Sequence, residues 1–481
     1  MEASITELRH TFRSGITRSY SWRKSQLQSL SKLLSDNEHQ CFQALRQDLG
    51  KSNLECYKDE IGPLKKSVDY ALSHLKDWMN PKKVGIPMIF FPSKGEIKSE
   101  PFGLVLIISS WNFPFNLALE PLIGALAAGN TVVIKPSEYA QACSSFLADT
   151  LPLYLDKMAV KVIEGDADTT QQLLQYKWDK IFFTGSPRVG RLVMSEAAKH
   201  LTPVTLELGG KCPVIFDFGS MSSDIQVAVK RVASGKWGVC SGQACLAIDY
   251  LLVEEKFASP LIDLLKGTIN KLYGENSRNI PRMANKRNFG RLQKLLEDPL
   301  VADSVIHGGS VDEENLHIEP TILLNPPLNS EVMADEIFGP ILPIITLNNI
   351  LESIEFINSR PKPLTIYAFT HNEALKDRIS TETSSGSIVF NDVIIHFLCD
   401  ELPFGGVGQS GTGSYHGKYS FDAFSHEKPV LDRGFLLELD ARYPPWNAFK
   451  MEFVRLAYKL NYFGLLLLFL GLRSYGSYND H

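Results

Sequence analysis

The sequence of 481 residues predicts an α/β protein with two parallel sheets covered by helices. From about residue 100 onwards, short apolar segments of strand length alternate with helical patterns, which is typical of βαβ units. Hydrophobic residues make up 44% of the chain and charged residues 21%, which is the composition of a globular protein with large apolar cores. A chain of this length corresponds to roughly three domains, or to two larger ones.

The first part of the chain is predicted to be helical. Apolar residues recur at helical spacing from Ser4 to about Trp78. Ser4 and Glu7 match a capping box, which predicts that the first helix begins at this point. After Pro81 the pattern becomes β-like and is interrupted by proline and glycine, so residues 81–101 are expected to form an extended arm.

Strands follow in two groups, which predict two α/β domains. The strands expected in the first domain, which ends near residue 206, are Leu104–Ile108, Thr131–Ile134, Val160–Ile163, Lys180–Phe183 and Val204–Leu206. The strands expected in the second domain are Pro213–Phe216, Tyr250–Val253, Ile341–Leu347, Ile366–Phe369 and Ile388–Phe390.

The stretch Asp400–Phe424 is rich in glycine and has no helical periodicity. It is therefore expected to form loops and a second extended arm. Two such arms favour the exchange of strands between subunits. The alternative is that both arms are surface hairpins of a monomer.

The charges and the cysteines exclude several classes of protein. Lys and Arg number 49 and Asp and Glu 54, so the net charge of −5 lacks the basic excess of a nucleic-acid-binding protein. The seven cysteines are an odd number and are scattered, unlike those of a secreted disulfide scaffold, which predicts a cytoplasmic protein. The N-terminus lacks the apolar segment of a secretory signal. No residue is assigned to a metal.

Polar residues follow the predicted strands at positions where open α/β sheets bind ligands. Asn112 follows the strand Leu104–Ile108, and its amide could donate to an oxyanion or form an Asx-turn that caps the next helix. Lys135 and Glu138 follow the next strand along the chain. They could bind ribose hydroxyls or form a solvated ion pair.

A helix start follows the strand Lys180–Phe183. Ser186 suits the N-cap and Pro187 the first helical position, so the free backbone amides could receive a phosphate. Gly185 and Gly190 do not complete the G-x-G-x-x-G pattern of dinucleotide-binding proteins.

Two further residues are candidates for covalent chemistry. Cys245 follows Gly242, which permits close approach of the backbone, although an isolated cysteine is usually a small buried apolar residue. Glu207 lies between two leucines at a strand end, where a carboxylate needs a partner or a task. The alternative for Glu207 is a salt bridge to Lys211.

Taken in order, the motifs resemble those of the NAD(P)-dependent aldehyde dehydrogenases. Two later motifs, at residues 415–422 and 442–445, resemble most the class 3 and fatty aldehyde dehydrogenase branch, in a plant-like version. The similarity covers about residues 5–445. The motifs are Trp-Asn-Phe-Pro (111–114), Lys-Pro-Ser-Glu (135–138), Phe-Thr-Gly-Ser (183–186), Leu-Glu-Leu-Gly-Gly-Lys (206–211), Gly-Gln-Ala-Cys (242–245), Glu-Ile-Phe-Gly-Pro (336–340) and Pro-Phe-Gly-Gly-Val-Gly (403–408).

The resemblance implies a Rossmann-type cofactor domain, an α/β catalytic domain and a β oligomerisation arm, in a homodimer. The implied ranges are 1–80 with 102–206 for the NAD-binding domain, 207–395 for the catalytic domain, 81–101 with 396–428 for the arm, and 429–481 for a C-terminal tail.

The resemblance also implies the roles of the site residues. Cys245 is the nucleophile, Glu207 the general base and Asn112 the oxyanion donor. Aldehydes are oxidised through a thiohemiacetal and a thioester, and Glu207 indicates hydrolysis of the thioester rather than transfer to CoA. The residues implied in binding NAD, with NADP as the alternative, are Trp111, Lys135, Glu138, Gly185, Ser186, Gly190, Glu336 and Phe338.

The substrates expected are medium- or long-chain aliphatic or aromatic aldehydes. Two other functions stay open: a cysteine esterase that needs no cofactor, and a non-catalytic structural relative. A carboxylate at Glu138 favours NAD over NADP, because it would repel a 2′-phosphate.

The tail carries an amphipathic pattern from Trp446 to Leu460, followed by an uncharged run from Tyr462 to Leu472. This run is too short to span a bilayer. Residues 446–472 are expected to bind membrane surfaces reversibly and to cover the substrate funnel. The alternative is a helix packed on its own subunit or on the partner.

Overall fold

The chain is described by a computed structural model for residues 1–274, 280–436 and 438–475, so the predicted ranges 207–395 and 429–481 both include residues outside the described part. It divides into two compact units. The first joins Met1–Trp78 to Pro101–Ser425, and the second joins Met79–Glu100 to the segment from His426 onwards. The first unit includes residues 396–425, for which the sequence predicts an arm.

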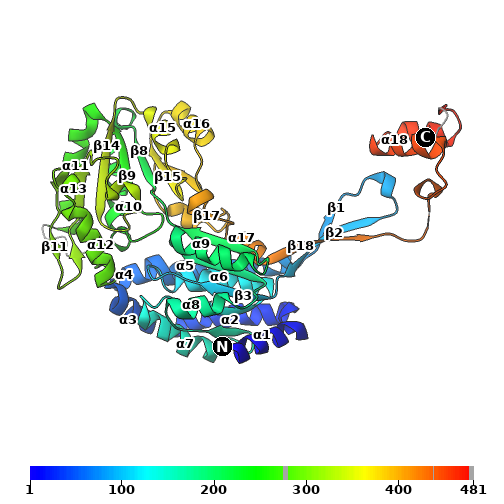
Figure 1. Cartoon of the computed structure of the whole chain (residues 1–481), viewed down its shortest axis with the longest axis horizontal. Coiled ribbons are helices and arrows are strands. Elements are labelled where there is room, and N and C mark those ends of the chain that lie inside the picture. The colour runs from blue at the N-terminus through cyan, green and yellow to red at the C-terminus, as the bar shows by residue number, and fades with distance from the viewer. Residues whose placement is uncertain (275–279, 437, 476–481) are drawn as a thin grey trace. The chain divides into compact units, whose positions relative to one another are not determined.

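The first sheet of the larger unit is a six-stranded sheet of the Rossmann type (Figure 1). Its strand order is β17-β7-β6-β3-β4-β5, parallel except for β17, so the first strand, β3, lies in the middle beside β6. The strands predicted from the sequence are confirmed, and each begins at its predicted residue. The bounds are β3 Leu104–Ile108, β4 Thr131–Lys135, β5 Val160–Val162, β6 Lys180–Gly185, β7 Val204–Leu208 and β17 Gly411–Thr412.

Helices cover this sheet. Apolar side chains of α1 (Glu2–Ser14), α8 (Ala167–Leu174) and α9 (Pro187–Ala198) share one core cluster with the sheet. The capping box predicted for Ser4 is wrong, because α1 begins at Glu2, and its N-cap makes no side-chain hydrogen bond. The other helices before residue 155 are α2 Tyr20–Asp36, α3 Glu38–Leu49, α4 Asn53–Cys56, α5 Gly62–Met79, α6 Asn116–Ala128 and α7 Gln141–Tyr154.

The second sheet has seven strands in the order β10-β13-β14-β9-β8-β15-β16, and all neighbours are parallel except β10 and β13. The predicted strands are again confirmed. Two further ones were not predicted, β10 (Val305–His307) and β13 (Thr321–Leu324), because segments this short carry little periodicity. The predicted strands are β8 Pro213–Phe216, β9 Tyr250–Glu254, β14 Ile341–Leu347, β15 Thr365–Phe369 and β16 Ser387–Phe390.

Further helices and strands complete the larger unit. They are α10 Ile225–Trp237, α11 Glu255–Tyr273, α12 Lys286–Glu297, α13 Pro299–Ala302, β11 Val311–Asp312, β12 His317–Ile318, α14 Glu331–Ala334, α15 Glu352–Asn358, α16 Glu373–Glu382 and α17 Gly417–Ala423.

The prediction that Asp400–Phe424 lacks helix is wrong, since α17 lies within it. This helix packs against α6. Gly124 of α6 makes the close approach possible, because a Cβ atom at this position would lie 2.6 Å from the Ser420 Cβ. A helix of only two turns shows no clear periodicity in the sequence.

The second unit begins with a three-stranded sheet in the order β1-β2-β18, formed by Lys82–Val84, Lys94–Pro101 and Ser425–Asp432. Strands β1 and β2 are antiparallel. An ion pair of 2.8 Å joins Lys428 on β18 to Glu100 on β2.

The tail of the second unit forms two helices, α18 (Ala448–Tyr458) and α19 (Tyr462–Phe469). They are separated at Leu460, which has a φ of +48°. Their apolar sides meet in a small cluster that includes Phe453 and Leu465. Among the described residues, no helix is both long enough and apolar enough to cross a membrane.

Candidate active site

The carboxyl ends of three neighbouring strands, β3, β6 and β7, bring several of the predicted site residues together. Strands β3 and β6 pair up to Ile108 and Phe183, so the loop that follows β3 lies beside the end of β6. On the other side of β6, Thr184 pairs with Glu207 of β7. The chain reverses its winding between β3 and β6, and ligands of open α/β sheets bind at such a point.

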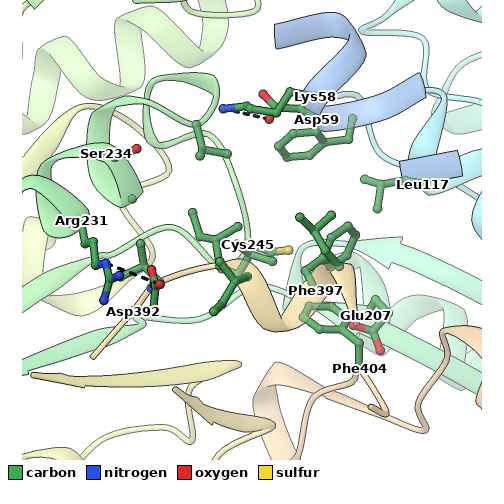
Figure 2. A pocket seen from close by; sticks show the side chains of 18 of the residues that line it. Lys58, Asp59, Leu117, Glu207, Arg231, Ser234, Cys245, Asp392, Phe397 and Phe404 are labelled. Carbon is green, nitrogen blue, oxygen red and sulfur yellow. Dashed lines mark hydrogen bonds and ion pairs between the residues drawn. The ribbon is translucent and has the colours of Figure 1, made fainter. Parts of the chain in front are cut away.

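A cavity of about 280 Å³ adjoins this edge. Cys245 and Glu207 both line it, and the Cys245 sulfur points into the open space (Figure 2). Two ion pairs also lie at its walls, Lys58 with Asp59 and Arg231 with Asp392. The rest of the lining is mostly apolar and includes Phe113, Leu117, Val239, Leu246, Val393, Ile394, Ile395, Phe397, Leu398, Phe404 and Tyr415.

Cys245 is held in a tight turn before β9. The turn is closed by a hydrogen bond from the Ala247 amide to the Ala244 carbonyl, 2.9 Å long. The Tyr367 hydroxyl donates to the Leu246 carbonyl at 2.7 Å, which fixes the residue after the cysteine. All seven cysteines are free, and five of them are buried, whereas Cys245 is partly exposed to the cavity. This placement argues against the interpretation of Cys245 as a buried apolar residue.

Burial raises the pKa of the Cys245 thiol, and the carboxylates of Glu336 and Glu207 add to the effect. The backbone amides of Cys245 and Leu246 oppose it by hydrogen bonding to the sulfur. The thiol must lose its proton before it can attack an electrophile. The two amides are also positioned to stabilise negative charge next to the sulfur.

Glu207 is a buried carboxyl group without a partner. The residue is 4% exposed, and neither carboxylate oxygen has a hydrogen-bond partner. Burial raises the pKa of Glu207 well above its usual value. The alternative of a salt bridge to Lys211 is wrong, because that ammonium pairs with Asp249 and donates to the Val332 carbonyl.

Asn112 is buried and is not among the residues that line the cavity. Its amide nitrogen donates one hydrogen bond, of 3.0 Å, to the carbonyl oxygen of Gln243, two residues before Cys245. A second N–H of the same group is left for another acceptor. The Asx-turn alternative does not hold, since the N-cap of α6 is Phe115 and has no side-chain cap.

The residues predicted after β4 and β6 are also in place. Lys135 is buried and pairs with the half-buried Glu138 at 2.8 Å, so the pair is not a solvated one. Ser186 caps α9, where its side chain accepts a hydrogen bond from the Val189 amide. Gly190 lies inside α9, where a Cβ atom would meet the Leu208 side chain at 2.7 Å.

Glu336 and Phe338 lie in the loop that precedes β14 of the second sheet, and they contact residues of the first sheet's strand-end loops. The Phe338 ring packs edge-on against Trp111, with ring centroids 5.4 Å apart. Burial raises the pKa of Glu336 to about 8, with a smaller contribution from Asp249. A side chain at Gly209 would collide with the Glu336 carboxylate, so this glycine makes room for it.

The comparison with known proteins agrees with this geometry. The sequence profile of the aldehyde dehydrogenase family matches residues 2–430. The chain belongs to this family. It is 56% identical to aldehyde dehydrogenase family 3 member F1 of Arabidopsis thaliana over 98% of both chains, and 43% identical to family 3 member A2 of Rattus norvegicus over 94% of this chain and 93% of the relative.

A solved structure described as the substrate-bound state of AldH from Staphylococcus aureus is similar to this aldehyde dehydrogenase throughout. The TM-score is 0.91 at 41% identity, covering 95% of this chain and 99% of the other. These comparisons confirm the fold class and the predicted class 3 relationship. Members of the family oxidise aldehydes and use NAD(P), as this chain does.

The strand-end residues of this aldehyde dehydrogenase fit a dinucleotide. Glu138 offers a half-buried carboxylate for ribose hydroxyls, and the capped start of α9 offers backbone amides for a phosphate. Thr184, the last residue but one of β6 before this helix, has a buried hydroxyl without a hydrogen-bond partner, and it also lines the cavity that contains Cys245. The donor set therefore suits the ribose and phosphate groups of NAD(P).

Most residues that line the cavity of the enzyme were missed from the sequence. The largest groups of them come from α10 and from residues 392–404, which are far apart in the chain. Their spacing carries no signal, because loop residues gather at a site only through the fold. Lys51 and Glu60, buried behind the Asn112 loop, were missed as well.

Proposed function

We propose that this enzyme oxidises medium- or long-chain aliphatic, or aromatic, aldehydes to carboxylic acids, with water as the acyl acceptor. Cys245 is the nucleophile, Glu207 the general base and Asn112 the oxyanion donor. The observation that carries the proposal is that the sulfur of Cys245 and the unpartnered carboxyl group of Glu207 line one largely apolar cavity.

In this proposal the chain's own residues act in two steps. The Cys245 thiolate attacks the aldehyde carbon, and the oxygen that becomes negative accepts hydrogen bonds from the Asn112 amide and the backbone amide of Cys245. Later, Glu207 takes a proton from water as the water attacks the thioester carbonyl. The acid leaves, and the proton returns to the sulfur. This hydrolysis makes transfer to CoA unnecessary.

We assign the residues that would bind NAD(P) from their positions at the ends of the strands. When bound, NAD(P) supplies the acceptor for the hydride. Lys135 and Glu138 would hold the adenosine ribose, Glu336 and Phe338 the nicotinamide ribose, and Trp111 would pack beside them. The remaining proposed contacts, on the pyrophosphate side, are Gly185, Ser186 and Gly190.

Glu138 is expected to make the enzyme prefer NAD to NADP. Its carboxylate can accept from a free 2′-hydroxyl and would repel a 2′-phosphate. Glu138→Gln should therefore raise kcat/KM for NADP relative to NAD by about five- to tenfold, since like charges near a protein surface cost on the order of 1 kcal/mol or more. Steady-state kinetics with both coenzymes measure the ratio.

Glu196→Gln is the matched control. It also removes one carboxylate, but Glu196 lies in the last turn of α9, at the end opposite to the proposed cofactor contacts. Its coenzyme ratio should stay at the wild-type value. Arg188, in the first turn of α9, could screen a 2′-phosphate. An NADP preference in the wild-type enzyme would contradict the role of Glu138.

We make three proposals about location and assembly. We propose that the enzyme is cytoplasmic, in keeping with seven free cysteines. We propose a homodimer formed through the β1-β2-β18 sheet, whose strand β18 has an exposed edge. We also propose that residues 446–472 bind membrane surfaces. Exposed apolar side chains there are Trp446, Tyr458, Leu460, Tyr462, Phe463, Leu466, Phe469, Leu470 and Leu472.

The substrate and the tail are tested together. For the full chain, kcat/KM for NADH formation should rise by about fourfold for each added CH₂ until the cavity is filled, because each buried CH₂ contributes about 0.8 kcal/mol. A truncation ending at Pro445 should lose flotation with liposomes and lose part of the preference for long aldehydes.

Two outcomes would contradict these proposals. A flat response of the full chain to aldehyde length would reject medium and long aliphatic substrates. Equal flotation and equal length preference in both forms would reject the membrane and covering roles of residues 446–472. The two helices would then be a packing element, as their shared apolar cluster allows.

A further inference from the structure

A fully buried ion pair lies behind the loop that carries Asn112. Lys51 follows helix α3, and Glu60 lies in the π-helical turn Tyr57–Ile61 between α4 and α5. Their side chains have no exposed surface, and Lys51 Nζ is 2.9 Å from Glu60 Oε1. The next residue back, Asp59, lines the substrate cavity. Neighbouring residues of this one turn therefore line the cavity and form the ion pair behind the Asn112 loop.

Both members of the pair bind the backbone of the Asn112 loop. Lys51 Nζ donates to the carbonyl oxygen of Asn112 at 3.2 Å. Glu60 Oε2 accepts from the backbone amides of Phe115 and Asn116, at 2.9 and 3.1 Å. Hydrogen bonds to ionised groups are stronger than neutral ones. The pair therefore holds the loop at its start and at its junction with α6.

Asn112 is held from the opposite side by the loop of the nucleophile. Its side chain donates to the Gln243 carbonyl. The Gln243 side chain in turn donates to the carbonyls of Cys240 and Arg282, at 3.0 and 3.1 Å, and accepts from the Ala284 amide at 3.1 Å. The Asn112 amide thus lies between two fixed groups, the ion pair behind it and the turn of the nucleophile in front.

We propose that Lys51 and Glu60 are positioning residues that set the place of the Asn112 amide relative to Cys245. This inference rests on the proposed function, in which Asn112 donates to the oxyanion. The pair does not touch the substrate. It acts through the backbone of residues 112–116, and a shift of about 1 Å in a catalytic group can cost 10²-fold in rate.

The charge state of Lys51 is consistent with this role. Burial, the largest single effect, lowers the pKa of Lys51, but the charge and hydrogen bond of Glu60, with smaller contributions from Cys240 and Asp59, raise it overall. The ammonium therefore stays protonated and keeps donating to the Asn112 carbonyl at neutral pH.

A purely structural role explains the pair less well. Replacing a buried ion pair by uncharged groups of similar size is often neutral for stability, because the cost of desolvation offsets the attraction. What an uncharged pair cannot reproduce is the set of charged hydrogen bonds to the loop. A structural role predicts a change in Tm without a change in the chemical step.

The test uses the double variant K51M/E60Q, which leaves no single charge buried. The rate of the first NADH turnover with saturating aldehyde is expected to fall by about 10- to 100-fold, while KM for NAD stays at its wild-type value. In an Asn112→Ala background the same two changes should cause no further loss, since they act through Asn112.

Three results separate the hypotheses. A first-turnover rate within twofold of wild type in the double variant would overturn the positioning role. The positioning role would also be overturned if K51M/E60Q lowered the first-turnover rate by the same factor in the wild-type and Asn112→Ala backgrounds. An Asn112→Ala variant with wild-type rates would instead reject the oxyanion role of the proposed function itself.

Three more variants complete the test. Lys180→Met removes another buried lysine, at the amino end of β6 and away from the site, and should keep the wild-type rate. Lys51→Arg keeps a donor near the Asn112 carbonyl and should recover part of the rate. If the double variant does not fold, as judged by Tm, Glu60→Gln alone is measured. This variant keeps an oxygen acceptor and should show a smaller loss of first-turnover rate. A first-turnover rate equal to wild type in Glu60→Gln would overturn the inference.

Discussion

Replacing Cys245 with alanine is expected to abolish aldehyde oxidation while leaving NAD(P) binding intact. The sulfur is the group that would form the covalent bond to the aldehyde, and the described lining of the cavity contains no other cysteine. The cofactor contacts proposed at the strand ends do not involve Cys245. NADH formation with aldehyde and the affinity for NAD, measured by fluorescence titration, give the two readouts.

Cys399 provides the matched control, since it is the other cysteine that is partly exposed. Cys399→Ala should turn over aldehyde at the wild-type rate. Residual activity of Cys245→Ala comparable to wild type would reject the assignment. A cysteine esterase would lose acyl hydrolysis in the same variant, but its wild-type form would hydrolyse acyl esters without NAD(P) and would produce no NADH from aldehydes.

Glu207→Gln is expected to slow steady-state turnover by about 10²- to 10⁴-fold, as is usual for loss of a general base. The first turnover should still form NADH, because Cys245 remains. The thioester should therefore accumulate and be visible as a mass increase on Cys245 after rapid quenching. A turnover rate equal to wild type would show that Glu207 does not activate water.

The pH dependence of this step follows from the raised pKa of Glu207. Only the carboxylate form can accept a proton from water, and a raised pKa means that this form appears at higher pH than for an ordinary glutamate. Thioester hydrolysis in the wild-type enzyme should therefore increase with pH. The Gln variant should lose this increase.

Glu120→Gln is the control for removing a buried carboxyl group. Burial raises the pKa of Glu120 to about 7, and the residue lies on α6, outside the lining of the cavity that contains Cys245. Thioester hydrolysis should be unchanged in this variant. If CoA were the true acceptor, adding CoA would accelerate loss of the thioester from Glu207→Gln and from the wild-type enzyme alike.

The parallel strands were predictable because their signal is local. A strand buried on both faces is a short apolar run, and such runs marked β3, β8 and β14 at their observed bounds. The helix α17 was not predictable in the same way. It is a short element whose place depends on the fit of Gly124 against Ser420 across two distant segments.

The candidate site was predicted in part for a related reason. Because parallel strands end at one edge of a sheet, polar residues at or just after the ends of β3, β4, β6 and β7 were expected to gather, and the structure places them at one edge. Which alternative holds for each residue depends on its contacts in the folded chain. Lys211 follows Glu207 by four residues, yet it turns to Asp249, and this leaves Glu207 unpaired in the cavity.

The sequence by itself determined the fold class, the family resemblance and the order of the strand-end motifs, because apolar periodicity and short motifs are properties of neighbouring residues. Only the tertiary structure decided which groups share the cavity, which carboxyl group lacks a partner, and that Lys51 and Glu60 stand behind Asn112. Those relations join residues far apart in the chain, and desolvation and hydrogen-bond geometry exist only once the chain has packed.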